Sequence, residues 1–353
     1  MRNKFYTPLI PISLLALILG MWAGLQRMGW SLPAMNLALA HGPLMVSGFL
    51  GTLVMLERAV ALRRGWMFIP PALTGLGWVL SLALPGQPLG ALLFTLGNLG
   101  GIAILAVIVR RETHIYTVAM LVGMVVWFGG NLLWLSGKAI FQIVFAWQAF
   151  LILTIVGERL ELNRVLRPTP RALMLFKVAA GIFLGGVILS VVNLGWGARV
   201  SGAGMLLLTV WSLRYDIAIR NLRHRLPLTR YIAWCLFLGF VWMGVAGGIN
   251  LFYGRLVAGP LYDAAIHAVF VGFVISMIFG HAPIIFPALL QIQIVFSRWF
   301  YIHLALLHAS LVVRLIGNLA NDVLLRKWGG MINSVAIVLF LGMTVVSLVR
   351  GKK

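Results

Sequence analysis

Long apolar stretches recur along the whole chain, and they constrain its fold more than any other feature of the sequence. A helix that crosses the hydrocarbon core of a bilayer needs about 20 mainly apolar residues. The sequence therefore predicts an all-α, polytopic membrane protein, with residues 1–353 as a single integral membrane domain. Twelve stretches of spanning length can be counted, near residues 8–28, 37–59, 67–84, 88–109, 115–136, 139–157, 171–192, 195–213, 230–253, 264–288, 299–320 and 329–349.

Composition excludes a soluble protein. Hydrophobic residues make up 61% of the chain and charged residues only 10%, with a mean hydropathy of +1.02. No soluble protein of this length has that balance. The net charge of +21 resembles that of a nucleic-acid-binding protein, but Lys and Arg in short membrane loops explain it better. We therefore expect the lipid bilayer as a partner and no nucleic acid. The one cysteine, Cys235, excludes an intramolecular disulfide.

The distribution of positive charge predicts the orientation in the membrane. With the N-terminus in the cytoplasm, six of the 28 Lys and Arg residues fall in outer loops and Arg314 falls within a span. The remaining 21 lie in inner loops or at inner ends. Cytoplasmic loops carry such an excess of Lys and Arg. The sequence thus predicts twelve spans with both termini cytoplasmic.

A weak internal repeat suggests how the spans are grouped. GGNLLWLSG (129–137) ends the fifth span and GGINLFYG (247–254) ends the ninth, while LERAVALRR (56–64) and GERLELNR (157–164) end the second and sixth. Similar ends every four spans suggest three four-helix arcs with pseudo-three-fold symmetry, in which spans two, six and ten are equivalent. The alternative is that such residues are common at the ends of any membrane helix.

Four of the seven histidines lie between Tyr262 and His308, in segments apolar enough to sit in a bilayer. His267 and His281 are 14 residues apart on one predicted helix. At about 100° per residue they fall about 40° short of four turns, so both leave the same face, separated by about 21 Å along the axis. Ionisable residues inside a membrane are costly and indicate function. Two histidines stacked in this way would suit two metal or haem sites.

The outer site is predicted from His41 in the second span and His267 in the tenth. Both spans enter from outside, so the two imidazoles are expected at matching depth and would hold a b-type haem iron between them. The alternative is two separate, hydrogen-bonded histidines near the interface. Met45, one turn below His41, is a substitute ligand candidate, although a methionine on an apolar helix usually serves packing.

The inner site is predicted around His281, which precedes Pro283 and Pro287. Those prolines should loosen the helix and expose backbone carbonyls. His303 on the eleventh span is expected at the depth of His281, and His308 lies nearer the midplane. The two are five residues apart, about 140° around the helix, so they cannot both face one atom. In this hypothesis either His303 or His308 pairs with His281 to hold a second haem or a copper ion. The sequence does not decide which of the two histidines is the ligand.

Arg314 lies in the outer half of the eleventh span and requires an anionic partner there. A haem propionate, Asp322 or Asp263 would serve, and snorkelling toward the surface is the alternative. No C-x-x-C-H motif occurs, which excludes covalently attached c-type haem.

Two stretches carry a resemblance to known families: AHGPLMVSGFLG around His41, and HAVFVGFVISMIFGHAPI around His267 and His281. With twelve spans and histidines on spans two and ten, the chain resembles the catalytic subunit of the haem-copper oxidases. It is more similar to the NnrS family, twelve-span haem and copper proteins of the bacterial nitric oxide response. The resemblance implies haem ligation by His41 and His267, a metal at His281 and a place in the inner (cytoplasmic) membrane of a bacterium. Departures are also present: the early motif has one histidine, and Gly280-His281 is followed by Ala-Pro rather than Thr-Gly-Arg.

The leading hypothesis is therefore an integral membrane protein with one or two b-type haems and a copper ion as a further candidate. Its role would be electron transfer, with a redox partner protein, or chemistry on a small diatomic such as nitric oxide. The rivals are a cofactor-free permease coupled to protons or substrate, and a scaffold subunit whose histidines only pack.

Overall fold

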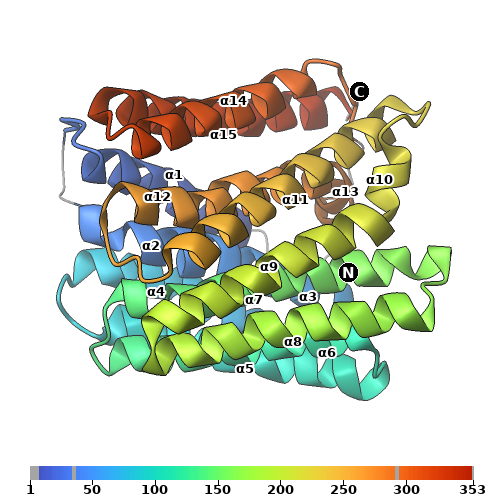
Figure 1. Ribbon diagram of the computed structural model, residues 1–353, viewed down its shortest axis with the longest axis horizontal. Helices are drawn as coiled ribbons and strands as arrows, with labels where there is room; N and C mark the ends of the chain where they lie inside the picture. The colour runs from blue at the N-terminus through green and yellow to red at the C-terminus, as the bar shows by residue number, and fades with distance from the viewer. Residues whose placement is uncertain (1–7, 34–36, 291–293, 352–353) are drawn as a thin grey trace. The chain divides into compact units, whose positions relative to one another are not determined.

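A computed structural model of the chain describes residues 8–33, 37–290 and 294–351, and all regular structure among them is helical. Eleven helical stretches in these residues are long and apolar enough to cross a membrane. Each of the twelve predicted segments coincides with a helix (Figure 1). These findings confirm the predicted fold class, an all-α polytopic protein.

The one predicted span outside those eleven is α9, Leu194–Tyr215. It is 22 residues long, but Arg199 and several glycines make it less apolar than the others. It packs closely against α8, Pro170–Val192, because a Cβ at Gly186 or Gly204 would overlap the backbone of the neighbouring helix. Small residues at such a crossing are typical of paired membrane helices.

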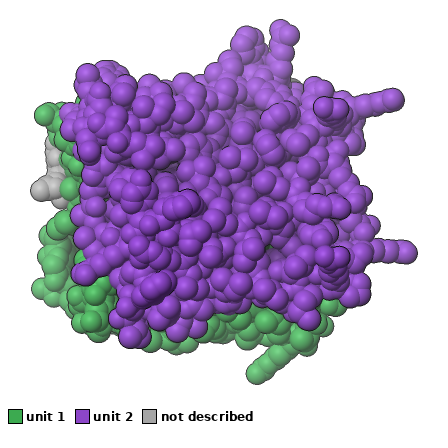
Figure 2. Space-filling view, in the orientation of Figure 1, with its two compact units in different colours: residues 1–157 green, residues 158–353 purple. Residues whose placement is uncertain are grey.

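The chain divides into two compact units, Met1–Gly157 and Glu158–Lys353, which Figure 2 shows in different colours. The boundary falls within one helix, α7, Ile140–Leu162. Two units do not correspond to three four-helix arcs, and the pseudo-three-fold arrangement stays a prediction. That residues 1–353 form a single integral membrane domain also stays a prediction.

The first unit is built around the second predicted span. That span begins with a short 3-10 turn, η2, and α2, continues as a π-helical segment, η3, and ends as α3. The segment η3 packs against α1 and α4, and α5 packs against both α4 and α6. The elements are α1 Leu9–Arg27, η2 Ala38–Ala40, α2 His41–Pro43, η3 Leu44–Gly51, α3 Thr52–Leu62, η4 Gly65–Phe68, α4 Ile69–Ala83, α5 Leu89–Arg111, α6 Ile115–Leu135 and the larger part of α7.

The second unit is organised around α11, which contacts α9 on one side and the tenth predicted span on the other. Helices α14 and α15 run side by side (Figure 1). After the end of α7, the elements are η5 Asn163–Leu166, α8, α9, α10 Ile217–Asn221, α11 Pro227–Tyr253, α12 Gly259–His267, η6 Ala268–Ile275, α13 Ser276–Leu290, α14 Phe300–Leu319 and α15 Val323–Arg350.

Two π-helical segments interrupt the described helices, and the sequence did not predict either. One is η3 in the second span and the other is η6 in the tenth, each eight residues long. In both, a glycine lies against an indole: a Cβ at Gly51 would overlap Trp127, and one at Gly272 would overlap Trp242. Such segments are rare and often occur at functional sites.

Helix α13 continues through Pro283 and Pro287. A proline has no N–H, so the carbonyl groups four residues earlier, on Phe279 and Pro283, lose their usual donors. The predicted exposure of backbone carbonyls therefore has a structural basis, although the helix is not broken there.

Candidate functional site

Five histidines of the predicted sites lie in membrane-spanning helices. His41 begins α2 in the first unit, whereas His267, His281, His303 and His308 belong to the second unit. The pairing of His41 with His267, which lie in different units, therefore stays a prediction. The pairing of His281 with His303 or His308, within the second unit, also stays a prediction.

The His41 ring is held by α1. Its Nδ1 lies 2.7 Å from the carbonyl oxygen of Gly20. The ring occupies the space left by a second glycine, because a Cβ at Gly24 would be 2.8 Å from Cε1 and 2.9 Å from Nδ1. Met45 packs on Gly20 in the same way, with Sδ 2.7 Å from the position of a Cβ. The spacing of Gly20 and Gly24 by four residues thus forms the surface that receives His41 and Met45.

His267 and His281 each bond to the backbone one turn earlier. The Nδ1 of His267 lies 2.8 Å from the carbonyl oxygen of Asp263, and that of His281 lies 2.7 Å from the carbonyl oxygen of Met277. A carbonyl oxygen only accepts, so Nδ1 carries the proton in both rings and in His41 as well. In a neutral imidazole this places the lone pair on Nε2 in all three rings.

His303 is enclosed by aromatic rings and has both nitrogens engaged. Its Nε2 lies 2.9 Å from the Tyr231 hydroxyl and its Nδ1 lies 3.5 Å from Sδ of Met343. Because a thioether only accepts, Nδ1–H donates to the sulfur and Nε2 accepts from the hydroxyl. Phe279 and Phe340 contact the same ring, which is fully buried.

His308 belongs to a chain of buried hydrogen bonds. The indole N–H of Trp242 donates to Nδ1 at 2.9 Å, so Nε2 carries the proton and donates to the Ser276 hydroxyl at 3.2 Å. Ser276 in turn donates to the carbonyl oxygen of Cys235 at 2.7 Å. Binding a metal at His303 or His308 would require one of these hydrogen bonds to break.

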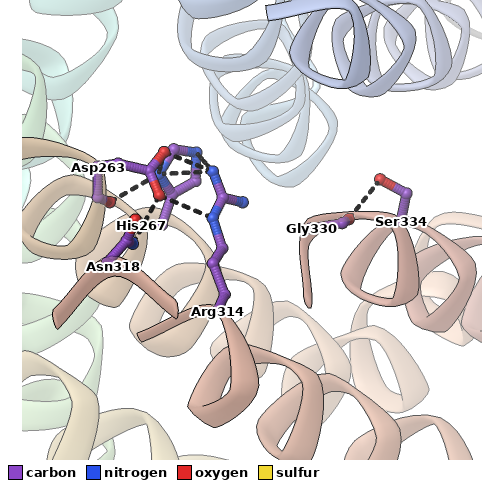
Figure 3. Close-up of polar contacts among 6 residues, drawn as sticks. All are labelled: Asp263, His267, Arg314, Asn318, Gly330 and Ser334. Atoms are coloured by element: carbon purple, nitrogen blue, oxygen red, sulfur yellow. Dashed lines mark hydrogen bonds and ion pairs between the residues drawn. The ribbon is translucent and has the colours of Figure 1, made fainter. Parts of the chain in front are cut away.

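Arg314 forms a bidentate ion pair with Asp263 (Figure 3). Its Nε donates to Oδ2 at 2.9 Å and its Nη2 donates to Oδ1 at 2.6 Å. Asn318, one turn later on α14, donates through Nδ2 to Oδ2 at 2.9 Å. Of the two aspartates considered as partners of Arg314, the structure thus shows Asp263, and a contact with a haem propionate stays a prediction. Asp322 instead caps α15 by accepting from the amides of Leu324 and Leu325.

The guanidinium of Arg314 also covers His267. Its Nη2 lies 3.2 Å from both ring nitrogens. An atom at this distance from both ring nitrogens cannot lie in the plane of the ring, because it would overlap another ring atom such as Cε1. The Nη2 atom therefore lies over the face of the ring. It therefore does not lie along the in-plane direction of the Nε2 lone pair. Asp263 adds a second contact to His267, with Oδ1 3.1 Å from Nδ1.

A second Arg-Asp-Asn cluster occurs near the start of the second unit. Arg159 donates through Nε to Oδ2 of Asp216 at 2.9 Å and through Nη2 to Oδ1 at 2.7 Å. Asn163, one turn after Arg159, contacts Oδ2 through Nδ2 at 3.5 Å. Asp216 also accepts from the amide of Ala218, and Asn163 accepts from that of Ile217, which fixes the start of α10.

Comparison with known proteins assigns a family without a function. A family model described as Domain of unknown function (DUF8744) matches residues 7–349. The chain belongs to the DUF8744 family. No curated protein and no solved structure matches it. Since the DUF8744 description names no activity, the resemblance to NnrS and the oxidases stays a prediction.

In this DUF8744 chain, no group of three or more His, Cys, Asp or Glu side chains that could hold a metal occurs among the described residues. One further feature escaped sequence reasoning. Arg159 lies in the basic stretch that ends the sixth predicted span, but the structure buries it against Asp216. The sequence holds a signal for this cluster, because R-L-x-x-N occurs at both Arg159–Asn163 and Arg314–Asn318.

Proposed function

We propose that this protein is a haem-binding membrane protein with a redox role, and that His41 and His267 are the axial ligands of a b-type haem. The observation that supports the proposal is the state of the imidazoles. A ligating histidine usually donates its other ring N–H to a backbone carbonyl or a carboxylate, which fixes the tautomer and the ring orientation. His41, His267 and His281 each donate Nδ1–H to a carbonyl oxygen.

The same criterion separates the candidates of the inner site. His281 donates Nδ1–H to the backbone carbonyl of Met277, as a ligating histidine usually does. His303 and His308 instead form hydrogen bonds with the side chains of Tyr231, Met343, Trp242 and Ser276. We therefore favour His281 as the inner ligand for a second haem or a copper ion. A partner from α14 would first have to exchange a hydrogen bond for the metal.

The proposed role follows from ligand number. The iron of a bis-imidazole haem has no open coordination position and transfers single electrons. Binding a diatomic molecule requires an open coordination position, so this chemistry would belong to the inner site. The resemblance to NnrS favours nitric oxide as that diatomic. Placement in the bacterial inner membrane, and a redox partner protein that exchanges electrons with the outer site, are parts of the same proposal.

A reduced-minus-oxidised spectrum with metal analysis of the same purified preparation tests this proposal. We expect a Soret band, a dithionite-induced band in the visible region and iron. His41→Ala and His267→Ala should each lose these bands, while His224→Ala, in a loop, should keep them. A colourless wild-type preparation would overturn the haem assignment. An unchanged spectrum in both ligand variants would overturn the ligands alone.

A permease is the second candidate, and the tenth span favours it. This span contains η6 and then the two prolines of α13, and interrupted helices of this kind form substrate sites in transporters. The Asp263–Arg314 pair beside His267 would then respond to protons or substrate. Substrate-dependent uptake into reconstituted vesicles, abolished in Asp263→Asn, is the expected outcome of that alternative.

A further inference from the structure

Four polar contacts surround the carboxylate of Asp263, three of them hydrogen bonds from Arg314 and Asn318. Oδ1 accepts from Nη2 of Arg314 at 2.6 Å and lies 3.1 Å from Nδ1 of His267. Oδ2 accepts from Nε of Arg314 and from Nδ2 of Asn318, both at 2.9 Å. An ionised carboxylate has about four acceptor positions, so these contacts use all of them. Asp263 is therefore held in one orientation.

The cluster at Asp216 has the same atomic arrangement, and it shows what the arrangement does. There Oδ1 accepts from Nη2 of Arg159 and from the amide of Ala218, each at 2.7 Å. Oδ2 accepts from Nε of Arg159 and from Asn163. An arginine and an asparagine one turn apart thus orient the carboxylate so that Oδ1 accepts one further N–H.

The two clusters differ in the further group that lies at Oδ1. In the Asp216 cluster it is a backbone amide at the start of α10, so the cluster is structural. In the Asp263 cluster it is the imidazole of His267 in a membrane span, whose Nδ1 lies 3.1 Å from Oδ1 while its N–H donates to the backbone carbonyl of Asp263 at 2.8 Å. The clusters also differ in exposure: the side chain of Asp216 is 0% exposed and that of Asp263 is 21% exposed.

We propose that Asp263 is a positioning residue for His267, and that Arg314 and Asn318 hold it for that purpose. This inference rests on the proposed function, in which His267 is a haem ligand. A carboxylate beside Nδ1–H, together with the backbone carbonyl that accepts this N–H, fixes the ring orientation and makes Nε2 a stronger electron donor. The guanidinium over the ring face limits its rotation. Arg314 thus acts through Asp263 and His267.

The effect on the haem has a defined sign. A stronger donor stabilises ferric over ferrous iron and lowers the midpoint potential. Asp263→Asn keeps the backbone carbonyl that accepts Nδ1–H but removes the negative charge beside it, so the potential should rise, and haem affinity should fall about 10- to 100-fold, as for other partners of metal ligands. Asn318→Ala removes one donor from Oδ2 and leaves the carboxylate more basic, so the potential should fall. Opposite signs would not result from a general loosening of the fold.

The test is a potentiometric titration of the full-length protein in nanodiscs, with haem content and thermal unfolding measured on the same samples. Asp216→Asn is the matched control and should lower the unfolding temperature without moving the potential. A haem protein whose potential is unchanged in Asp263→Asn, or shifts equally in Asp216→Asn, would overturn the positioning role alone. A wild-type protein without haem would overturn the proposed function and this inference together. If Asp263→Asn does not fold, a rise rather than a fall in Asn318→Ala would overturn the positioning role.

Discussion

Single imidazoles in a membrane interior differ in chemistry according to their hydrogen bonds. The sequence predicts which histidines are buried, but it does not determine which nitrogen carries the proton, because that depends on a partner from another turn or helix. His41 illustrates this, since its partner is the carbonyl of Gly20 on a different helix. The Arg314–Asp263 pair was among the expected options because a buried charge requires a nearby counter-charge.

His308→Leu tests the distinction between the two groups of histidines. The substitution leaves the indole N–H of Trp242 without its acceptor, and a buried unsatisfied donor costs about 1–3 kcal/mol. We expect a lower unfolding temperature and an unchanged haem spectrum. His224→Ala, in the loop after α10, should change stability by no more than about 0.5 kcal/mol. Loss of half or more of the haem in a folded His308→Leu protein would contradict this assignment.

Arg159→Met tests the buried ion pair at Asp216. Removing one partner leaves an uncompensated charge whose side chain is 0% exposed, and such losses cost about 3–5 kcal/mol. We expect poor accumulation in the membrane and a large drop in unfolding temperature. Arg164→Met changes an exposed arginine of the following turn and serves as the control. Equal stability of the two variants would show that the pair contributes little.

At the scale of whole helices, apolar periodicity and length predict the elements well, because the bilayer requires about 20 apolar residues for each span. The π-helical segments escaped prediction for a physical reason. Their wider turns depend on contacts such as Gly51 with Trp127, which join residues far apart in the sequence. The start of the short helix α10 likewise depends on the buried Asp216, which Arg159 holds from far earlier in the sequence.

The contact between α1 and the second span provides a test at this scale. In Gly24→Ala, the added Cβ would lie 2.8 Å from Cε1 of His41, so the ring must leave the Gly20 carbonyl. We expect haem content to fall by more than half, with a stability loss of about 1–3 kcal/mol from overpacking. Gly129→Ala is the control, since nothing lies within 4 Å of a Cβ there. Full haem content in Gly24→Ala would contradict the role of this glycine.

For the molecule as a whole, the orientation depends on whether α9 crosses the membrane. If it does, the basic loop 214–230 lies in the cytoplasm, as the distribution of Lys and Arg predicts. If it does not, every later span reverses, and His267 and Arg314 move to the opposite side. The close packing of α9 on α8 at Gly186 and Gly204 favours a crossing helix.

The single cysteine makes this question directly testable. Cys235 is buried, so Cys235→Ser gives a cysteine-free background in which new cysteines report on accessibility. In intact cells, Lys138→Cys, in the loop before α7, should react with a membrane-impermeant maleimide. Arg223→Cys, in the loop after α9, should react only after permeabilisation. Labelling of Arg223→Cys in intact cells would mean that α9 does not cross. The predicted common depth of His41 and His267, on which the proposed outer haem site depends, would then be lost, because the tenth span would enter from the cytoplasm.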